Sequence, residues 1–201
     1  MLITKAEPTL ERFEHPNLGR LVQPRHYPRI EDTAKKRPWA ADNDAFNNFN
    51  KENFTKMLNR LSGLERCLFV AAPDVVADMD GTLELFEVWQ PQIKEAGLPV
   101  ALVLQDGMLP NNIPLDKCDA VFIGGTTEWK LGIEAAAIVK KANDREMWTH
   151  MGRVNSDKRI RTARAIGCKS VDGTGYAKFT DTHLLNGLNM VRYMGKQGVI
   201  F

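Results

Sequence analysis

The sequence has little cysteine, little net charge and no long apolar run, and these shortages exclude several classes of protein. Its three cysteines, Cys67, Cys118 and Cys168, are an odd number without CxxC spacing, which argues against a disulfide framework and a structural zinc site. No stretch approaches the roughly 18 apolar residues of a membrane span. The mixed, charged segment at residues 1–20 lacks the apolar core of a secretion signal. We therefore expect a protein with no membrane partner, in a reducing, cytoplasmic setting.

Familiar cofactor and catalytic motifs are missing as well. The chain contains no GxGxxG fingerprint, no phosphate-binding loop and no Ser-His-Asp order. His150 has no second histidine placed to form a metal pair, and a single histidine is more often a hydrogen-bonded core residue than a catalyst. The sequence therefore implies neither a metal nor a redox cofactor.

Short apolar runs alternate with amphipathic segments along a chain of 201 residues, a length that suits one domain with a sizeable core. The predicted strands are Leu21–Gln23, Trp39–Ala41, Cys67–Ala72, Val100–Leu104, Ala120–Ile123, Met147–His150 and Lys169–Val171. The predicted helices are Lys51–Leu61, Gly81–Ala96, Thr127–Ala142, Asp157–Ile166 and Thr182–Tyr193. Such repeated strand–helix units predict an α/β protein with a parallel sheet covered by helices.

Polar clusters follow successive strands and suggest how the sheet is closed. They occupy residues 41–43, 73–74, 105–107, 124–128, 150–155 and 172–174. A closed barrel brings all such strand ends to one mouth, whereas an open doubly wound sheet gathers only those near its switch point. We therefore predict a compact (β/α)8-type barrel, shorter than the typical length of about 250 residues. Residues 1–36 are expected to form an arm with the first strand, and 37–201 the catalytic barrel, within one domain.

Two aspartates are the candidate catalytic pair. Asp172 follows the last apolar strand, so its carboxylate would face the mouth as a nucleophile or as the stabiliser of a cationic sugar centre. Asp42 would supply the acid/base partner that glycosidic chemistry requires, with Asp44 as a competitor for that role. Asp172 could instead cap the next turn, and the segment around Asp42 could simply be a turn.

A third group of polar residues could recognise the edge of a purine-like base. Carboxylate, amide and exposed backbone groups are suitable partners for such an edge, and these are Asp74, Gln105, Gly124 and Gly125. Other acidic residues of the same loops that could take this role are Asp78, Asp80 and Asp106. Glu128 either caps the helix that follows or faces the ligand.

One basic segment stands out although the net charge is only +2. Its cationic residues are Arg153, Lys158, Arg159, Arg161 and Arg164, and Ser156 is placed to cap the helix that contains most of them. Clustered Lys and Arg provide the part of nucleic-acid affinity that does not depend on sequence. The alternative is an ordinary solvated helix face.

These clusters occur in the same order as those of the tRNA-guanine transglycosylase superfamily. The chain most resembles its shortened DNA-acting branch, the DpdA-type guanine transglycosylases of phages and bacteria. The similarity extends from about Trp39 to Thr174 and rests on order and spacing. Residues 41–46 resemble the family's Ser-Asp-Ser-Gly-Gly-Phe, although its two glycines are missing here. This resemblance implies that Asp42 is the acid/base residue. Asp74, before a Trp-containing helix, resembles the family's base-recognition aspartate.

Four later segments extend the resemblance. Residues 103–107 are similar to the family's Val-Gln-Gly-Gly, and residues 124–128 to its Gly-Gly-Leu-Ala-Val-Gly-Glu. Residues 150–154 are similar to its Leu-Met-Gly-Val-Gly, and residues 167–172 to its Gly-Val-Asp-Met-Phe-Asp. The base-binding residues that this implies are Gln105, Gly124, Gly125 and Glu128. It further implies that Met151 lies against the flat face of the base and that Asp172 is the nucleophile.

The resemblance implies a transferase that replaces guanine in nucleic acid with a 7-deazaguanine base through a covalent aspartyl-sugar intermediate. The CxCxxC…H zinc site of the tRNA enzymes and the chain that follows their nucleophile are missing here. DNA is therefore the expected polymer rather than tRNA. A second copy of the chain or a partner protein could complete the recognition surface of so short a barrel.

Other functions stay open at the level of the sequence. A glycosidase or nucleosidase would use the same nucleophile and let water replace the incoming base. A non-catalytic barrel would bind nucleic acid through its basic helix and release no base. An aldolase-type lyase would need a Schiff-base lysine at a strand end, for which Lys130 and Lys169 are poorly placed.

Overall fold

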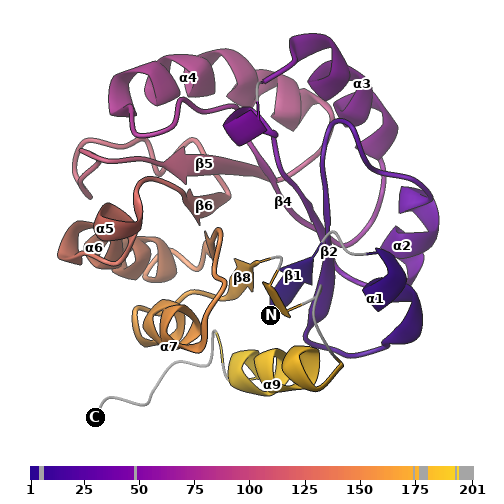
Figure 1. Ribbon diagram of the computed structural model, residues 1–201. Helices are drawn as coiled ribbons and strands as arrows, with labels where there is room; N and C mark the ends of the chain where they lie inside the picture. The colour runs from indigo at the N-terminus through magenta and orange to yellow at the C-terminus, as the bar shows by residue number, and fades with distance from the viewer. Residues whose placement is uncertain (5–6, 48, 174, 177–180, 193, 195–201) are drawn as a thin grey trace.

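The computed structural model describes residues 1–194 apart from 5–6, 48, 174, 177–180 and 193, and it forms a closed barrel of eight parallel strands in sequence order (Figure 1). The strands are β1 (Leu2–Thr4), β2 (Leu18–Val22), β3 (Trp39–Ala41), β4 (Cys67–Ala71), β5 (Val100–Leu104), β6 (Ala120–Ile123), β7 (Trp148–Met151) and β8 (Ser170–Asp172). β8 pairs with β1, which closes the sheet. The predicted (β/α)8-type barrel is confirmed.

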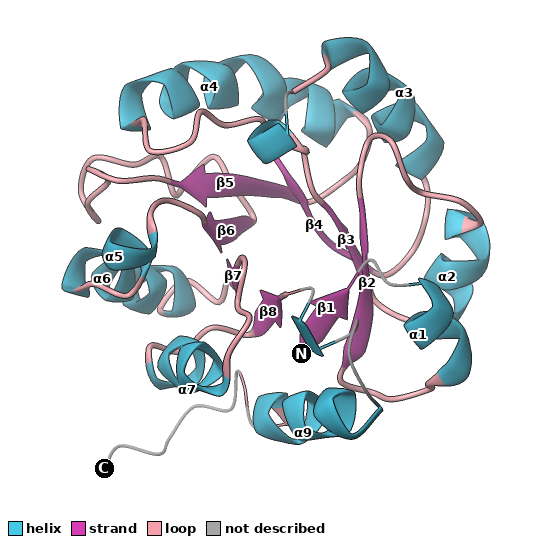
Figure 2. Cartoon of the chain, in the orientation of Figure 1, coloured by secondary structure: helices cyan, strands magenta, loops and turns pink. Residues whose placement is uncertain are grey.

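Helices surround the strands on the outside of the barrel (Figure 2). In the described residues they are α1 (Glu7–Arg12), α2 (Ile30–Lys36), α3 (Lys51–Leu61), α4 (Met79–Glu95), α5 (Thr127–Lys130), α6 (Ile133–Asn143), α7 (Asp157–Ala165) and α9 (Asp181–Val191), with a 3-10 turn η1 (Ala45–Asn47). No helix in this part of the chain is long and apolar enough to cross a membrane.

Residues 1–36, expected to form an arm with the first strand, supply two strands of the barrel, β1 and β2, and β2 overlaps the strand predicted at Leu21–Gln23. β1 pairs with β2, and β2 pairs with β3. Ile3 of β1 also lies in register with Asp172 of β8, so the start of the chain supports the strand that presents the candidate nucleophile. The sequence pattern concealed β1 because it has only three residues and is followed by a segment rich in charge and proline.

Element boundaries match the prediction closely in the middle of the chain and less well elsewhere. The bounds of β3, β5, β6 and α3 are as predicted. The predicted helix Thr127–Ala142 is two helices, because α5 ends at Lys130 and Gly132 caps a new helix, α6. β7 begins and ends one residue later than predicted.

Buried apolar side chains form two layers on either side of the sheet. Alternate residues of β5 show the division, since Val100 and Leu102 pack with the helices whereas Ala101 belongs to the smaller cluster inside the barrel. The fully or largely buried members of that inner cluster are Ile3, Leu21, Ala40, Phe69, Ala101 and Ala120. Because these side chains fill the barrel, polar groups that bind a ligand are left at its ends.

Candidate active site

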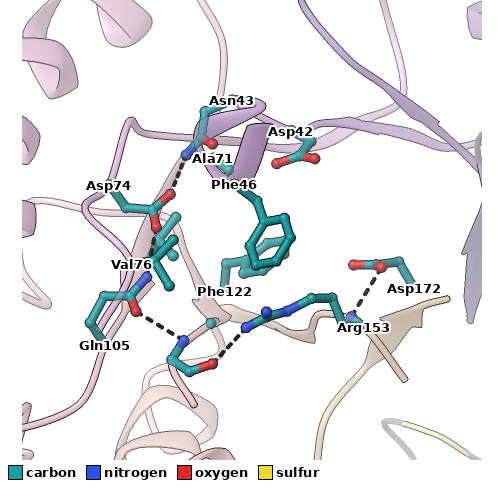
Figure 3. Close-up of a pocket in the computed structure, with 13 residues that line it drawn as sticks. Asp42, Asn43, Phe46, Ala71, Asp74, Val76, Gln105, Phe122, Arg153 and Asp172 are labelled. Carbon is teal, nitrogen blue, oxygen red and sulfur yellow. Dashed lines mark hydrogen bonds between the residues drawn. The ribbon is translucent and has the colours of Figure 1, made fainter. Parts of the chain in front are cut away.

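A pocket opens at the carboxyl ends of the strands, where the sequence predicts the site (Figure 3). It encloses about 530 Å³, including its open mouth. Segments at the ends of β3 to β8 contribute to its lining. The predicted site residues that line it are Asp42, Asp74, Gln105, Gly124, Gly125, Arg153 and Asp172.

Asp172 is the last residue of β8, and each of its carboxylate oxygens has one nitrogen partner. His150 Nε2 lies 2.9 Å from Oδ2, and the backbone N–H of Arg153 donates to Oδ1 at 3.1 Å. The side chain is 15% exposed, so a ligand in the pocket can still reach it. A carboxylate has about four lone-pair positions, which leaves positions on both oxygens for attack on an electrophile.

Asp42 directly follows β3 and accepts a hydrogen bond from Gln23 Nε2 at 2.9 Å. Burial raises the pKa of the Asp42 carboxyl, and the charges of Asp172 and Asp44 raise it further, whereas hydrogen bonds from Gln23 and from the Asp44 backbone oppose the rise. Asp44 is not part of the pocket lining and pairs with Arg25 at 2.6 Å. The geometry therefore favours Asp42 over Asp44 as the acid/base candidate.

Asp74 lies in the loop between β4 and α4, across the pocket from Asp172 (Figure 3). Its Oδ1 accepts a hydrogen bond from Asn43 Nδ2 and its Oδ2 one from Gln105 Nε2, both at 2.7 Å. Burial raises the pKa of Asp74 to about 6 despite these hydrogen bonds, and the charge of Asp42 adds to the rise. The remaining lone pairs of Asp74 can accept two N–H groups from a ligand.

Gln105 is buried and connects the loops around Asp74. Its Oε1 accepts hydrogen bonds from the backbone N–H of Ala77 at 2.9 Å and of Gly125 at 3.0 Å. Its Nε2 donates to Asp74. The amide oxygen and one amide hydrogen are thus used within the protein, so Gln105 holds the frame of the pocket and orients Asp74.

Gly124 and Gly125 line the pocket, but their backbone N–H groups are already engaged, which corrects the expectation that they are free for a base. Gly124 donates to the Leu104 carbonyl at 3.0 Å and Gly125 to Gln105. Gly125 adopts φ +63°, and a Cβ atom there would lie 2.8 Å from Asp106 Oδ2. The pair therefore provides a close turn and a narrow wall.

An aromatic ring and a guanidinium group cover the middle of the pocket. In Figure 3 the Phe46 ring lies between the side with Asp74 and the side with Asp172, and it is 68% exposed. The Arg153 guanidinium lies 5.0 Å from the centre of that ring, and its Nη2 donates to the Gly125 carbonyl at 2.6 Å. These groups offer flat surfaces to a planar ligand.

Two predicted site residues do not reach the pocket. Met151 is fully buried and belongs to the apolar layer between sheet and helices, so it cannot lie against a base in this arrangement. Neighbouring residues of a strand point to opposite faces, and in β7 His150 points into the barrel whereas Met151 points toward the helices. Glu128 is exposed in the first turn of α5, outside the pocket lining, and the residue that caps this helix is Thr126, whose side chain accepts from the Trp129 N–H.

The other acidic residues considered for base recognition hold the loops. Asp78 caps α4 by accepting a hydrogen bond from the Gly81 N–H at 3.1 Å. Asp80 is exposed in the first turn of the same helix. Asp106 accepts hydrogen bonds from the N–H and the hydroxyl of Thr126, at 2.8 and 2.6 Å. None of the three lines the pocket.

The basic segment forms α7, and Ser156 caps it as predicted by accepting from the Arg159 N–H. Because α7 follows the loop after β7, its first turn with Lys158 and Arg159 lies nearest the mouth. Arg159 Nη1 donates to the Arg153 carbonyl at 3.2 Å. The exposed cationic residues further along the helix are Arg161 and Arg164, and a rise of about 1.5 Å per residue places Arg164 about 9 Å beyond Lys158.

Several residues of the site were not predicted. Asn43 and Phe46, which line the pocket, were hidden inside what resembled a turn. Phe122, which also lines the pocket, and His150, which contacts Asp172, were hidden inside apolar strands. Lys130 is 2% exposed and donates from Nζ to the Gly152 carbonyl at 3.0 Å. Burial lowers the pKa of Lys130 to about 8, with a further contribution from the positive charge of Arg153.

Comparisons with known proteins give the fold. No family model and no curated protein sequence matches the chain. A ligand-free structure of a tryptophan synthase mutant from M. tuberculosis is similar over 96% of this chain and 89% of its own, at 14% identity and a TM-score of 0.50. The PaMucR phosphodiesterase in complex with c-di-GMP matches over 73% of this chain and 63% of its own, at 15% identity and a TM-score of 0.44. The chain thus spans less than two thirds of that protein, and at such identities the likeness to tryptophan synthase extends only to the barrel.

Proposed function

We propose that this protein exchanges a guanine-type base at an N-glycosidic bond in nucleic acid, through a covalent aspartyl-sugar intermediate. The supporting observation is the division of the pocket. Asp42 and Asp172 lie on one side, and Asp74 with Gln105 on the other, with the Phe46 ring between them (Figure 3). A base held on the second side would direct its glycosidic bond toward the first.

The second side suits the edge of guanine. Guanine presents a ring N–H and an exocyclic amine on one edge, and Asp74 retains free lone pairs for two such donors. Asn43 and Gln105 fix the plane of that carboxylate, so it is oriented before a ligand arrives. The apolar walls from Phe46 and Phe122 would contact the ring faces.

In the first half-reaction an Asp172 oxygen attacks C1′ of the sugar. A C1′–O bond forms and the bond from C1′ to the base nitrogen breaks, so that the electron pair leaves with the base. Asp42, whose raised pKa favours its acid form, donates a proton to the departing base. The product is an ester between Asp172 and the sugar.

In the second half-reaction a 7-deazaguanine base occupies the same pocket. The Asp42 carboxylate removes the N–H proton from its attacking nitrogen, the new C1′–N bond forms and the ester to Asp172 breaks. Two displacements at C1′ retain its configuration, as in retaining glycosidases. The residues need no metal or redox group for either half.

The polymer would contact the rim of the pocket. A base in a duplex must leave the helical stack to reach a site of this kind. Lys158 and Arg159 begin α7 beside the mouth, where they could contact the flanking phosphates. DNA is proposed in preference to tRNA on the resemblance to the shortened branch of the family.

An exchange assay tests the proposal directly. Purified protein is incubated with guanine-labelled DNA or tRNA, with and without 7-cyano-7-deazaguanine, alongside Asp172→Asn and the exposed control Asp80→Asn. We expect release from DNA that depends on the added base, is lost in Asp172→Asn and persists in the control. Release without added base would indicate hydrolysis, and no release from either polymer would refute the proposal.

A further inference from the structure

His150 lies inside the barrel, out of contact with solvent, yet it contacts the candidate nucleophile. It is 0% exposed, and the rings of Phe69 and Phe122 lie 5.0 and 4.7 Å from its own. Its Nδ1 is 2.8 Å from Ser170 Oγ and its Nε2 is 2.9 Å from Asp172 Oδ2. Each imidazole nitrogen therefore has one polar partner in the described structure.

The hydrogen bonds that connect Trp148, Ser170 and His150 have a defined direction. The Trp148 indole is only a donor, and its Nε1 donates to Ser170 Oγ at 2.8 Å. The buried hydroxyl of Ser170 then has one hydrogen to donate, and among the described residues its acceptor is His150 Nδ1. With Nδ1 as the acceptor, the ring proton is on Nε2 and is donated to Asp172.

The geometry points to His150 as a positioning residue for Asp172, held by Trp148 and Ser170 as the neutral tautomer that donates from Nε2. It fixes one carboxylate oxygen while the Arg153 backbone N–H fixes the other. A neutral donor orients the carboxylate without forming an ion pair that would weaken its nucleophilicity. This role rests on the proposed function of Asp172, whereas the tautomer itself does not.

The tautomer can be observed without any activity. Long-range ¹H–¹⁵N spectra of the whole protein, near neutral pH, distinguish a protonated ring nitrogen from an unprotonated one. His150→Gln identifies the signal among the four histidines of the chain. We expect an unprotonated Nδ1 and a protonated Nε2 for His150. A proton on Nδ1, alone or on both nitrogens, would overturn the inference even if base exchange is confirmed.

Activity then tests the positioning role. His150→Gln keeps an N–H near the position of Nε2, and His150→Phe removes it at similar ring size. Since a displacement of about 1 Å can cost about 100-fold in rate, we expect His150→Phe to lower kcat about 100-fold with KM little changed, and His150→Gln to stay within about tenfold of the wild type. Equal activities of the two folded variants would overturn the role. If the wild type shows the expected tautomer but no base exchange, the proposed function is refuted. The positioning role of His150 then fails with it, whereas the inference about the tautomer stands.

Discussion

Replacing Gln105 with methionine tests whether this residue holds the pocket together. The side chain is 1% exposed, and methionine has a similar length without hydrogen-bonding capacity comparable to the amide. The change leaves the N–H groups of Ala77 and Gly125 without their acceptor and removes one donor from Asp74. Ala77 is exposed, so water can replace its acceptor. The buried Gly125 N–H and the lost donor to Asp74 cost about 1–3 kcal/mol each, so we expect a loss of about 2–6 kcal/mol in the free energy of unfolding near pH 8.

The size of the loss should depend on pH because of Asp74. Its pKa of about 6 in the folded protein, against an ordinary value of 3.8, means that its stabilising contribution is present below about pH 4 and lost as pH rises through about 6. At neutral pH this costs the folded state about 3 kcal/mol. Without Gln105 the pKa of Asp74 should rise further, so the variant should lose about 1 kcal/mol more at pH 8 than at pH 5.

Urea denaturation at the two pH values measures both quantities. Gln92→Met is the matched control, since this exposed amide donates to the Val88 carbonyl of its own helix, and it should change stability by less than about 0.5 kcal/mol. A loss below about 1 kcal/mol for Gln105→Met at pH 8 would refute the framing role. A large loss of equal size at both pH values would refute only the contribution assigned to Asp74.

Two further substitutions separate stability from binding. Asp42→Asn should raise Tm by about 2–4 °C near pH 8, the shift expected for about 1 kcal/mol in a domain of this size, and by less near pH 4. The reason is that burial raises the pKa of Asp42 and makes its ionised form costly to the folded state; scanning calorimetry that finds a lower Tm at pH 8 would contradict this. Phe46→Ala should leave stability within about 0.5 kcal/mol because the ring is 68% exposed. It should weaken binding of a guanine-type base about 5- to 100-fold, as lost stacking implies, and unchanged affinity in calorimetric titration would exclude Phe46 as a stacking surface.

The order of polar strand ends was the part of the site that could be predicted. Parallel strands of a closed barrel bring their carboxyl ends to one mouth whatever their separation in sequence. Asp42, Asp74 and Asp172 therefore line one pocket although more than a hundred residues separate the first from the last. Seven predicted strands were enough for this argument, even though β1 was overlooked.

The direction of each side chain could not be predicted in the same way. Every residue of β7 after Trp148 is buried, so the sequence has no polar–apolar alternation to show which side chains face the interior. The assignment of Met151 to the ligand rested on the family resemblance, and nothing in this strand could test it, whereas His150 occupies the interior. The role of Gln105 was hidden for a related reason, since its three partners come from two other loops, those after β4 and β6, and a residue pattern does not show which distant residues pair.

The environments of the two catalytic candidates differ in the way that the proposed chemistry requires. Asp42 is half-buried beside other carboxylates, which raises its pKa and favours its protonated form, and an acid is what a departing base needs. Asp172 accepts one N–H on each oxygen, and an oriented carboxylate is what an electrophilic sugar carbon needs. If the roles were reversed, Asp172 would have to donate a proton while both of its oxygens accept hydrogen bonds from N–H groups. Asp42 would have to attack from a site that disfavours its charge. The surroundings of the two carboxyl groups, more than their positions in the sequence, therefore determine which role we assign to each.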